Sequence, residues 1–241
     1  MANVIQPVSQ GAANNLLEFM PTLQNNRKQK IITIVNGIDT SRFLIQESRD
    51  LHSELSLDRN VFLVGFLGRF MSQKGFTYLV QAVKKLLLDT SINRKIKIIA
   101  IGSGGYIREE MEGIESQGMK DDVYFLPGTN EVAKTLRGLD LLAMPSLWEA
   151  CSLLAMEALV AGVPVVGTDC IGLGEVLEGS PAKIVHTRDV DELAEAILEH
   201  VITNRKDEFN RYAKIAAQRF DISRVVNELI QLYQAQAISN A

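Results

Sequence analysis

The sequence predicts an α/β fold in which a parallel sheet carries helices on both faces. Two observations predict it. From residue 61 onward, strand-sized apolar runs alternate with helical segments. The runs are also continuously apolar, as in strands that are buried on both faces, rather than alternating between apolar and polar residues.

The first thirty residues differ from the rest of the chain. Residues 6–15 are small and polar, and residues 25–30 form a polar, basic turn. The apolar residues between them would form one face of a short helix: Leu16, Leu17, Phe19 and Met20. Residues 31–35 are strand-like and end at Asn36-Gly37, which signals a turn.

The regular elements follow in order from residue 61. Strands are expected at residues 61–67, 96–101, 123–126, 141–144 and 163–166, with a short one around Ile184. Helices are expected at residues 76–88, 106–116, 132–138, 152–161, 190–200, 206–219 and 222–236. Ligands of parallel sheets bind at the carboxyl ends of the strands, so the chemistry should follow Leu67, Ile101, Leu126, Met144 and Val166.

Composition excludes several classes of protein. The net charge of −4 argues against a general nucleic-acid binder, and no apolar run has the length of a bilayer span. Cys151 and Cys170 give no disulfide framework, and no signal peptide is recognisable, so a cytoplasmic setting is expected. His52, His186 and His200 lack the spacing of metal ligands, so we expect no metal site.

The most informative pair of residues is Glu149 and Glu157, eight positions apart. Glu149 lies in a loop that follows a strand, and Glu157 lies inside the next helix, which starts near Ser152. The first N–H groups of that helix have no internal partners and can hold a phosphate. Both glutamates could instead be solvated surface charges. However, the helix is apolar nearly all round, so Glu157 should be buried and need a partner.

Two cations follow the strand at residues 61–67. Arg69 offers a planar fork for phosphate oxygens and Lys74 a point charge, while Gly68 and Gly75 allow the backbone to approach a ligand. The alternative is that both cations are solvated surface residues. Their position at the carboxyl end of a strand favours phosphate binding.

Other turns at strand ends carry weaker signals. Gly102-Ser103-Gly104-Gly105 lacks the last spaced glycine of a dinucleotide fingerprint, so it is interpreted as a turn that lines a nucleotide pocket. Gly128-Thr129 resembles a simple turn before a helix. Gly172-Leu173-Gly174-Glu175 allows a helix start to face the cleft. Cys151 could be activated by its helix start, but no partner histidine is apparent, so packing is the better interpretation.

Taken together, these motifs resemble those of the retaining glycosyltransferases of family 4, over roughly residues 31–236. The matching segments are Asn36-Gly37-Ile38-Asp39, Gly68-Arg69 with Lys74-Gly75, Gly102-Ser103-Gly104, Pro145-Ser146 with the Glu149 and Glu157 pair, and Ala161-Gly162-Val163-Pro164-Val165. The resemblance implies the Rossmann-like C-terminal domain of the GT-B fold. One departure is Ala150-Cys151-Ser152, where the family often has a run like Gly-Phe-Gly, and it leaves the donor's identity open.

The resemblance also implies roles. Arg69 and Lys74 would bind the leaving diphosphate, Glu149 the donor sugar and Glu157 the ribose hydroxyls. The remaining donor contacts would come from the backbone around Gly68, Gly102, Gly128, Thr129, Cys151, Ser152 and Leu153. The family uses no metal, so the nucleotide-diphosphate sugar would be a substrate that needs no cofactor. The sugar would pass with retention to a glycan or lipid acceptor, as in polysaccharide or glycolipid assembly.

By the same resemblance, residues 1–40 are the end of a first domain with its linker, residues 41–221 the donor-binding domain, and residues 222–241 a helix that packs toward the first domain. The first domain normally supplies the acceptor site. The chain alone is therefore expected to bind nucleotide weakly and to transfer little sugar. The apolar face of its last helix is expected to be exposed or to self-associate: Val225, Leu229 and Leu232.

Two other functions stay open. A non-catalytic nucleotide-binding or interaction module could keep this fold. A GT-B epimerase or phosphorylase is the third possibility. The glutamate pair together with Arg69 and Lys74 weakens the epimerase interpretation, and no motif around Lys74 suggests a pyridoxal-phosphate lysine, which a phosphorylase would need.

Overall fold

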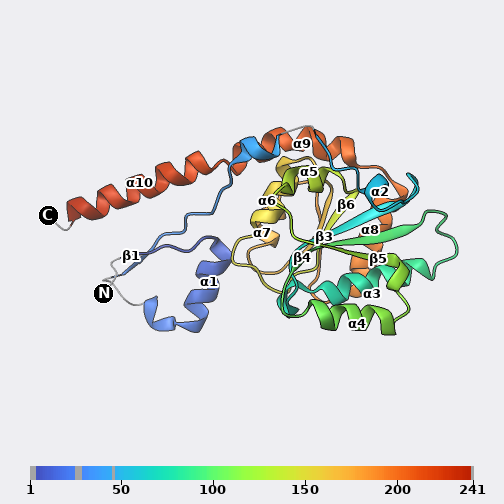
Figure 1. Ribbon diagram of the computed structural model, residues 1–241. Helices are drawn as coiled ribbons and strands as arrows, with labels where there is room; N and C mark the ends of the chain where they lie inside the picture. Colours follow the sequence, from blue (N-terminus) through green and yellow to red (C-terminus); the bar gives the residue numbers. More distant parts are fainter. Residues whose placement is uncertain (1–3, 25–28, 45–46, 240–241) are drawn as a thin grey trace.

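A six-stranded parallel sheet, in the order β5-β4-β3-β6-β7-β8, forms the centre of the molecule (Figure 1). The structure is a computed structural model that describes residues 4–24, 29–44 and 47–239. The strands are β3 (Phe62–Arg69), β4 (Ile96–Ser103), β5 (Val123–Leu126), β6 (Leu141–Met144), β7 (Val165–Thr168) and β8 (Lys183–Val185). Every strand pair in this sheet is parallel, as the continuous apolar runs predict.

Helices cover both faces of the sheet. One face packs against α3 (Phe76–Leu87), α4 (Ile107–Ser116) and α8 (Val190–Ile202). The other packs against α2 (Leu51–Glu54), α5 (Val132–Arg137), α6 (Leu153–Val160), α7 (Gly174–Leu177) and α9 (Lys206–Arg219). The predicted α/β fold with a doubly covered parallel sheet is confirmed.

Strand β3 shows how the sequence divides its side chains between the two cores. Phe62, Val64 and Phe66 point into the core beside α3 and α8, and Leu63 and Leu67 into the core beside α6. This alternation follows from the two-residue period of a strand. Because both sides are covered, nearly the whole strand is apolar, and it becomes exposed only at Arg69, where it leaves the sheet.

The N-terminal segment lies outside this sheet. Strands β1 (Val4–Ile5) and β2 (Lys30–Ile31) pair with each other in parallel, and α1 (Gln10–Phe19) connects them with a short 3₁₀ turn, Pro21–Leu23. At the other end of the chain, α10 (Ile222–Ser239) projects away from the sheet on the same side as α1 (Figure 1). The end of the N-terminal segment and the residue before α10 meet where Ile38 forms a parallel bridge with Asp221.

The N-terminal segment differs from its prediction. The strand expected at residues 31–35 is only Lys30–Ile31. The segment that follows β1 continues beside it through Pro7, which has no N–H to donate. Beyond Ile31 the hydrogen bonds therefore run in one direction, from the N–H groups of Ile34 and Asn36 to the oxygens of Pro7 and Val8. The helix expected around Leu16 already begins at Gln10, because the Ser9 side chain caps its first turn. The basic turn expected at residues 25–30 lies mostly outside the described residues.

Strand β7 begins at Val165 rather than at residue 163. Gly162, with a φ of +71°, ends α6 in a left-handed conformation, and Val163 donates its N–H to Ala158 O at 3.0 Å. This is a Schellman arrangement, so Val163 belongs to the helix cap. The helices α2 and α7 are four residues each and too short to show a helical period.

Candidate functional site

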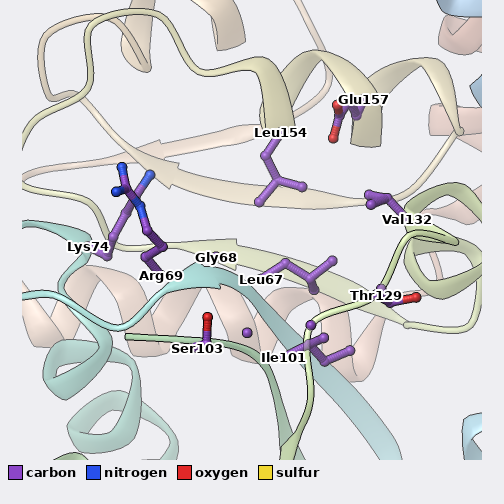
Figure 2. Close-up of a pocket in the computed structure, with 12 residues that line it drawn as sticks. Leu67, Gly68, Arg69, Lys74, Ile101, Ser103, Thr129, Val132, Leu154 and Glu157 are labelled. Carbon is purple, nitrogen blue, oxygen red and sulfur yellow. The ribbon is translucent and has the colours of Figure 1, made fainter. Parts of the chain in front are cut away.

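The carboxyl ends of β3, β4 and β5 and the first turn of α6 enclose a pocket of about 410 Å³ (Figure 2). Its wall comes from four segments that are far apart in the sequence: Leu67, Gly68, Arg69 and Lys74; Ile101, Gly102 and Ser103; Gly128, Thr129 and Val132; and Leu154 and Glu157. This edge of the sheet is where the parallel fold places ligands.

Polar and apolar groups divide the pocket. Figure 2 shows Arg69 and Lys74 together at one end, and Glu157 and Thr129 toward the other. Leu67 and Leu154 lie between the two ends, Val132 lies at the same end as Glu157 and Thr129, and Ile101 completes the apolar lining. A ligand that spans the pocket would meet positive charge at one end, an apolar middle and hydrogen-bond acceptors at the other end.

Two glycines make the pocket floor possible. Gly102 has a φ of +153°, and a Cβ there would lie 1.8 Å from the carbonyl oxygen of Gly68. Gly75 has a φ of +68°, and a Cβ there would lie 2.0 Å from the oxygen of Pro145. Gly75 therefore lets the loop of Lys74 lie directly against the loop that begins at Pro145, and Leu147 N donates to Gln73 O between the same loops at 2.8 Å.

This loop contact brings Lys74 to Glu149. The Lys74 Nζ donates to Glu149 Oε1 at 2.7 Å, and the Ser146 Oγ donates to the same oxygen at 2.9 Å. Arg69 is exposed, and within the described residues it forms no ion pair, so its guanidinium is available to a ligand. The pocket thus holds one paired and one unpaired cation at the same end.

Glu157 has no side-chain hydrogen bond or ion pair to the described residues. It is half-buried rather than fully buried, and burial raises the pKa of its carboxyl, an effect that the charge of Arg42 opposes. A half-buried carboxylate without a protein partner can accept hydrogen bonds from a ligand. The expected need for a partner is therefore not met by the part of the chain that the structure describes.

The predicted site residues separate into two groups. Gly68, Arg69, Lys74, Gly102, Gly128, Thr129 and Glu157 line one pocket, and Glu149 touches it through Lys74. Cys151 and Ser152 lie in the loop before α6, and Leu153 is the first residue of that helix. None of the three lines the pocket, and Leu153 is exposed. Their predicted contacts with a donor stay predictions. Burial raises the pKa of Cys151 to about 11, which disfavours a thiolate and agrees with a packing role.

The sequence analysis did not select four of the pocket residues: Leu67, Ile101, Val132 and Leu154. One of them could have been found, because Leu154 lies three positions before Glu157, on the same helix face. Ser103 belongs to the turn that was expected to line a nucleotide pocket, and it pairs in register with Arg69 across β3 and β4. The other three are ordinary aliphatic residues, which have no sequence signal separate from that of the core.

Comparison with known proteins agrees with this arrangement. The sequence model of the family described as "Glycosyl transferases group 1" matches residues 61–202, more than half of the chain. The chain belongs to this glycosyltransferase family. The match runs from β3 to the end of α8, and so it includes every segment of the pocket wall.

Individual relatives are more distant. An uncharacterized glycosyltransferase from Methanocaldococcus jannaschii is 26% identical over 90% of this chain and 60% of its own length. A D-inositol 3-phosphate glycosyltransferase from Rhodococcus erythropolis is 29% identical over 87% of this chain and 49% of its own length. The chain therefore spans about half to three fifths of these relatives.

Solved structures share the fold. Anabaena HepE, crystallised with UDP and glucose, superposes with a TM-score of 0.84 at 22% identity, over 98% of this chain and 64% of HepE. Sucrose-phosphate synthase from Thermosynechococcus elongatus superposes with a TM-score of 0.81 at 20% identity, over 100% of this chain and 60% of the synthase. These neighbours are GT-B glycosyltransferases, so the predicted GT-B fold is confirmed.

The described residues contain neither a cluster of metal ligands nor a helix that could span a membrane. No group of three or more histidine, cysteine, aspartate or glutamate side chains within them could hold a metal ion. None of the helices in the same part of the chain combines the length and the apolar character of a bilayer span.

Proposed function

We propose that this chain is the donor-binding part of a retaining glycosyltransferase of family 4, and that its pocket binds a nucleotide-diphosphate sugar. The observation that carries the proposal is the polarity of the pocket. Arg69 and Lys74 lie at one end, where a diphosphate needs cations. Glu157, which has no side-chain partner among the described residues, lies beyond the apolar middle, where ribose hydroxyls need an acceptor.

In the proposed reaction the bond between the sugar's anomeric carbon and the diphosphate oxygen breaks, and its electron pair leaves with the diphosphate. Arg69 and Lys74 stabilise the negative charge that develops there, which is the role that a metal ion plays in other transferases. The acceptor hydroxyl attacks from the same side of the sugar, so the configuration is retained, and its proton passes to the leaving phosphate oxygen. Glu149 accepts a hydrogen bond from a hydroxyl of the donor sugar.

The acceptor would be a glycan or a glycolipid. The reaction would take place in the cytoplasm, as a step in the assembly of a polysaccharide. The acceptor would bind mainly through a first domain, of which residues 1–40 are the end, while residues 41–221 hold the donor and residues 222–241 pack toward the first domain. With only these 241 residues we expect weak nucleotide binding and little or no transfer. No metal and no further cofactor would be required.

Calorimetric titration with UDP and UDP-glucose tests the proposal, because HepE structures contain these ligands. Wild type should bind both, and Arg69→Ala should weaken both by tenfold or more. Lys120→Ala, a change at a lysine with 74% of its side chain exposed, is the matched control and should bind as wild type does. Equal binding by Arg69→Ala would contradict the proposed diphosphate site. Absence of binding with any nucleotide-sugar would favour a non-catalytic interaction module.

A further inference from the structure

Ser146 is a buried polar residue in the loop that follows β6. It is 2% exposed, and it does not line the pocket. Its backbone oxygen accepts a hydrogen bond from the Thr168 hydroxyl at the end of β7, which fixes the serine to the sheet. The serine hydroxyl donates in turn to Glu149 Oε1 at 2.9 Å, three residues further along the loop.

The two oxygens of Glu149 have different surroundings. Oε1 accepts from both Ser146 Oγ and Lys74 Nζ, whereas Oε2 has no partner in the described part of the chain. The backbone is fixed as well, because Glu149 N donates to Ile171 O at 3.0 Å. The residue is only 8% exposed, so few alternative side-chain positions are open to it. Within the described residues, the carboxylate therefore has one oxygen that accepts two hydrogen bonds and one oxygen that accepts none.

The two donors to Oε1 differ in what a ligand would do to them. Lys74 lines the pocket, and a bound diphosphate would compete with Glu149 for its ammonium group. Ser146 is buried and does not line the pocket, so a diphosphate bound there would not compete for its hydroxyl. Of these two donors, the serine is the one that can keep its hydrogen bond to the carboxylate both before and after the donor binds.

We propose that Ser146 is a positioning residue, which holds Glu149 Oε1 so that Oε2 accepts a hydrogen bond from a hydroxyl of the donor sugar. This inference rests on the proposed function and adds a residue that acts through Glu149 without touching the donor. The inference predicts different effects on the binding of the sugar and on the binding of the nucleotide. Loss of the serine hydroxyl should weaken the contribution of the sugar to binding and leave that of the diphosphate unchanged.

The test measures dissociation constants for UDP and UDP-glucose, and uses the ratio of the two. Ser146→Ala removes the donor, and Ser146→Cys keeps a similar volume with a weak donor. The ratio of the UDP-glucose constant to the UDP constant should rise about three- to tenfold in Ser146→Ala and less in Ser146→Cys, which is the scale of one typical hydrogen bond. Glu149→Ala sets the upper limit of the change.

Thr135→Val is the matched control, because Thr135 is fully buried and its hydroxyl has no partner among the described residues. It should leave the ratio at the wild-type value. If Ser146 has only a structural role, its replacement should weaken the binding of UDP and of UDP-glucose alike. An unchanged ratio in both serine variants, together with a raised ratio in Glu149→Ala, would overturn this inference and leave the proposed function standing. Wild type that binds neither ligand would overturn the proposed function and the inference with it.

Discussion

The ammonium nitrogen of Lys74 lies 2.7 Å from a carboxylate oxygen of Glu149, although the two residues are 75 positions apart in the sequence. The pair is mostly shielded, with 23% of the lysine side chain and 10% of the glutamate side chain exposed. Removal of either partner would leave a shielded charge without its counter-charge. The pair therefore links stability of the fold to the diphosphate end of the pocket.

Replacement of Lys74 by methionine tests this link, because Lys74→Met keeps the length of the side chain and removes its charge. We expect UDP binding to weaken at least tenfold and the free energy of unfolding to fall by about 1–3 kcal/mol, since Glu149 keeps only the Ser146 hydrogen bond. Calorimetry and urea denaturation measure the two effects. Lys120→Met, at an exposed ion pair, should change neither by much. UDP binding at the wild-type level would show that Lys74 does not contact the diphosphate.

A second prediction concerns Glu157. Burial raises the pKa of its carboxyl, and the charge of Arg42 acts in the opposite direction. The ionised form accepts ribose hydroxyls, so UDP binding should weaken as the pH falls, and this should begin at a higher pH than an ordinary glutamate would give. Titrations of UDP between pH 8 and pH 5 measure the effect. Glu157→Gln should bind more weakly at pH 8 and lose this pH dependence.

The same shift has a consequence for stability. A carboxyl with a raised pKa in the folded state binds its proton more tightly there than in the unfolded chain, so its contribution to stability is present at low pH and is lost as the pH rises through the folded-state pKa. At neutral pH the charged Glu157 is therefore unfavourable for folding. Glu157→Gln should raise the melting temperature at pH 7.5 and reduce nucleotide binding. A lower melting temperature would indicate a hidden structural role for the carboxylate.

Much of this site was predictable because the carboxyl ends of parallel strands meet at one edge of a sheet. That rule alone places Arg69, Gly102 and Gly128 near one another, although they come from three different segments. The rule does not predict which side chains contact one another. The hydrogen bond from Ser146 to Glu149 depends on the conformation of the loop between β6 and α6. Leu154 rather than Leu153 lines the pocket because α6 begins at Leu153, one residue later than the sequence predicts.

The N-terminal segment was the least predictable part. Strand β1 has two residues and its partner is 26 positions away, so neither a period nor a nearby turn marks it. Helix α1 is placed by contacts with loops of the sheet domain, which no local sequence pattern reveals. The regular elements from residue 61 onward, by contrast, are long enough to show their periods, and their expected ends agree with the structure to within three residues.

A third prediction uses Gly102. Its φ of +153° is rarely adopted by other residues, and a Cβ would lie 1.8 Å from the Gly68 oxygen. Gly102→Ala should therefore push β3 and β4 apart at the pocket floor, lower the free energy of unfolding by about 1–3 kcal/mol and weaken UDP binding. Gly105→Ala is the control, because a Cβ at Gly105 would meet no atom within 4 Å. Equal urea midpoints for the two variants would contradict the steric argument.

The last prediction concerns the attachment of α1 to the loops beside the pocket. Both carboxylate oxygens of Glu175 accept backbone N–H groups at the start of this helix, from Gln10 at 3.1 Å and Gly11 at 3.0 Å. The Ser9 hydroxyl donates to Ala150 O, next to Glu149, at 2.6 Å. A carboxylate at a helix N-terminus satisfies otherwise unpaired donors and interacts favourably with the helix dipole. Glu175 thus holds the N-terminal segment against the loop that carries Glu149.

Replacement of Glu175 by alanine removes this attachment. In Glu175→Ala we expect hydrogen exchange at the first amides of α1 to become faster by about fivefold, which corresponds to a decrease of about 1 kcal/mol in the free energy of local opening. Exchange in β3 and β4 should stay unchanged, because their core does not depend on α1. The matched control is Glu178→Ala, at an exposed side chain three residues further along. If both variants exchange alike in α1, the carboxylate does not hold the helix. Gly11→Val should then be the change that releases it, because a Cβ at Gly11 would lie 3.2 Å from Ile171 Cγ2.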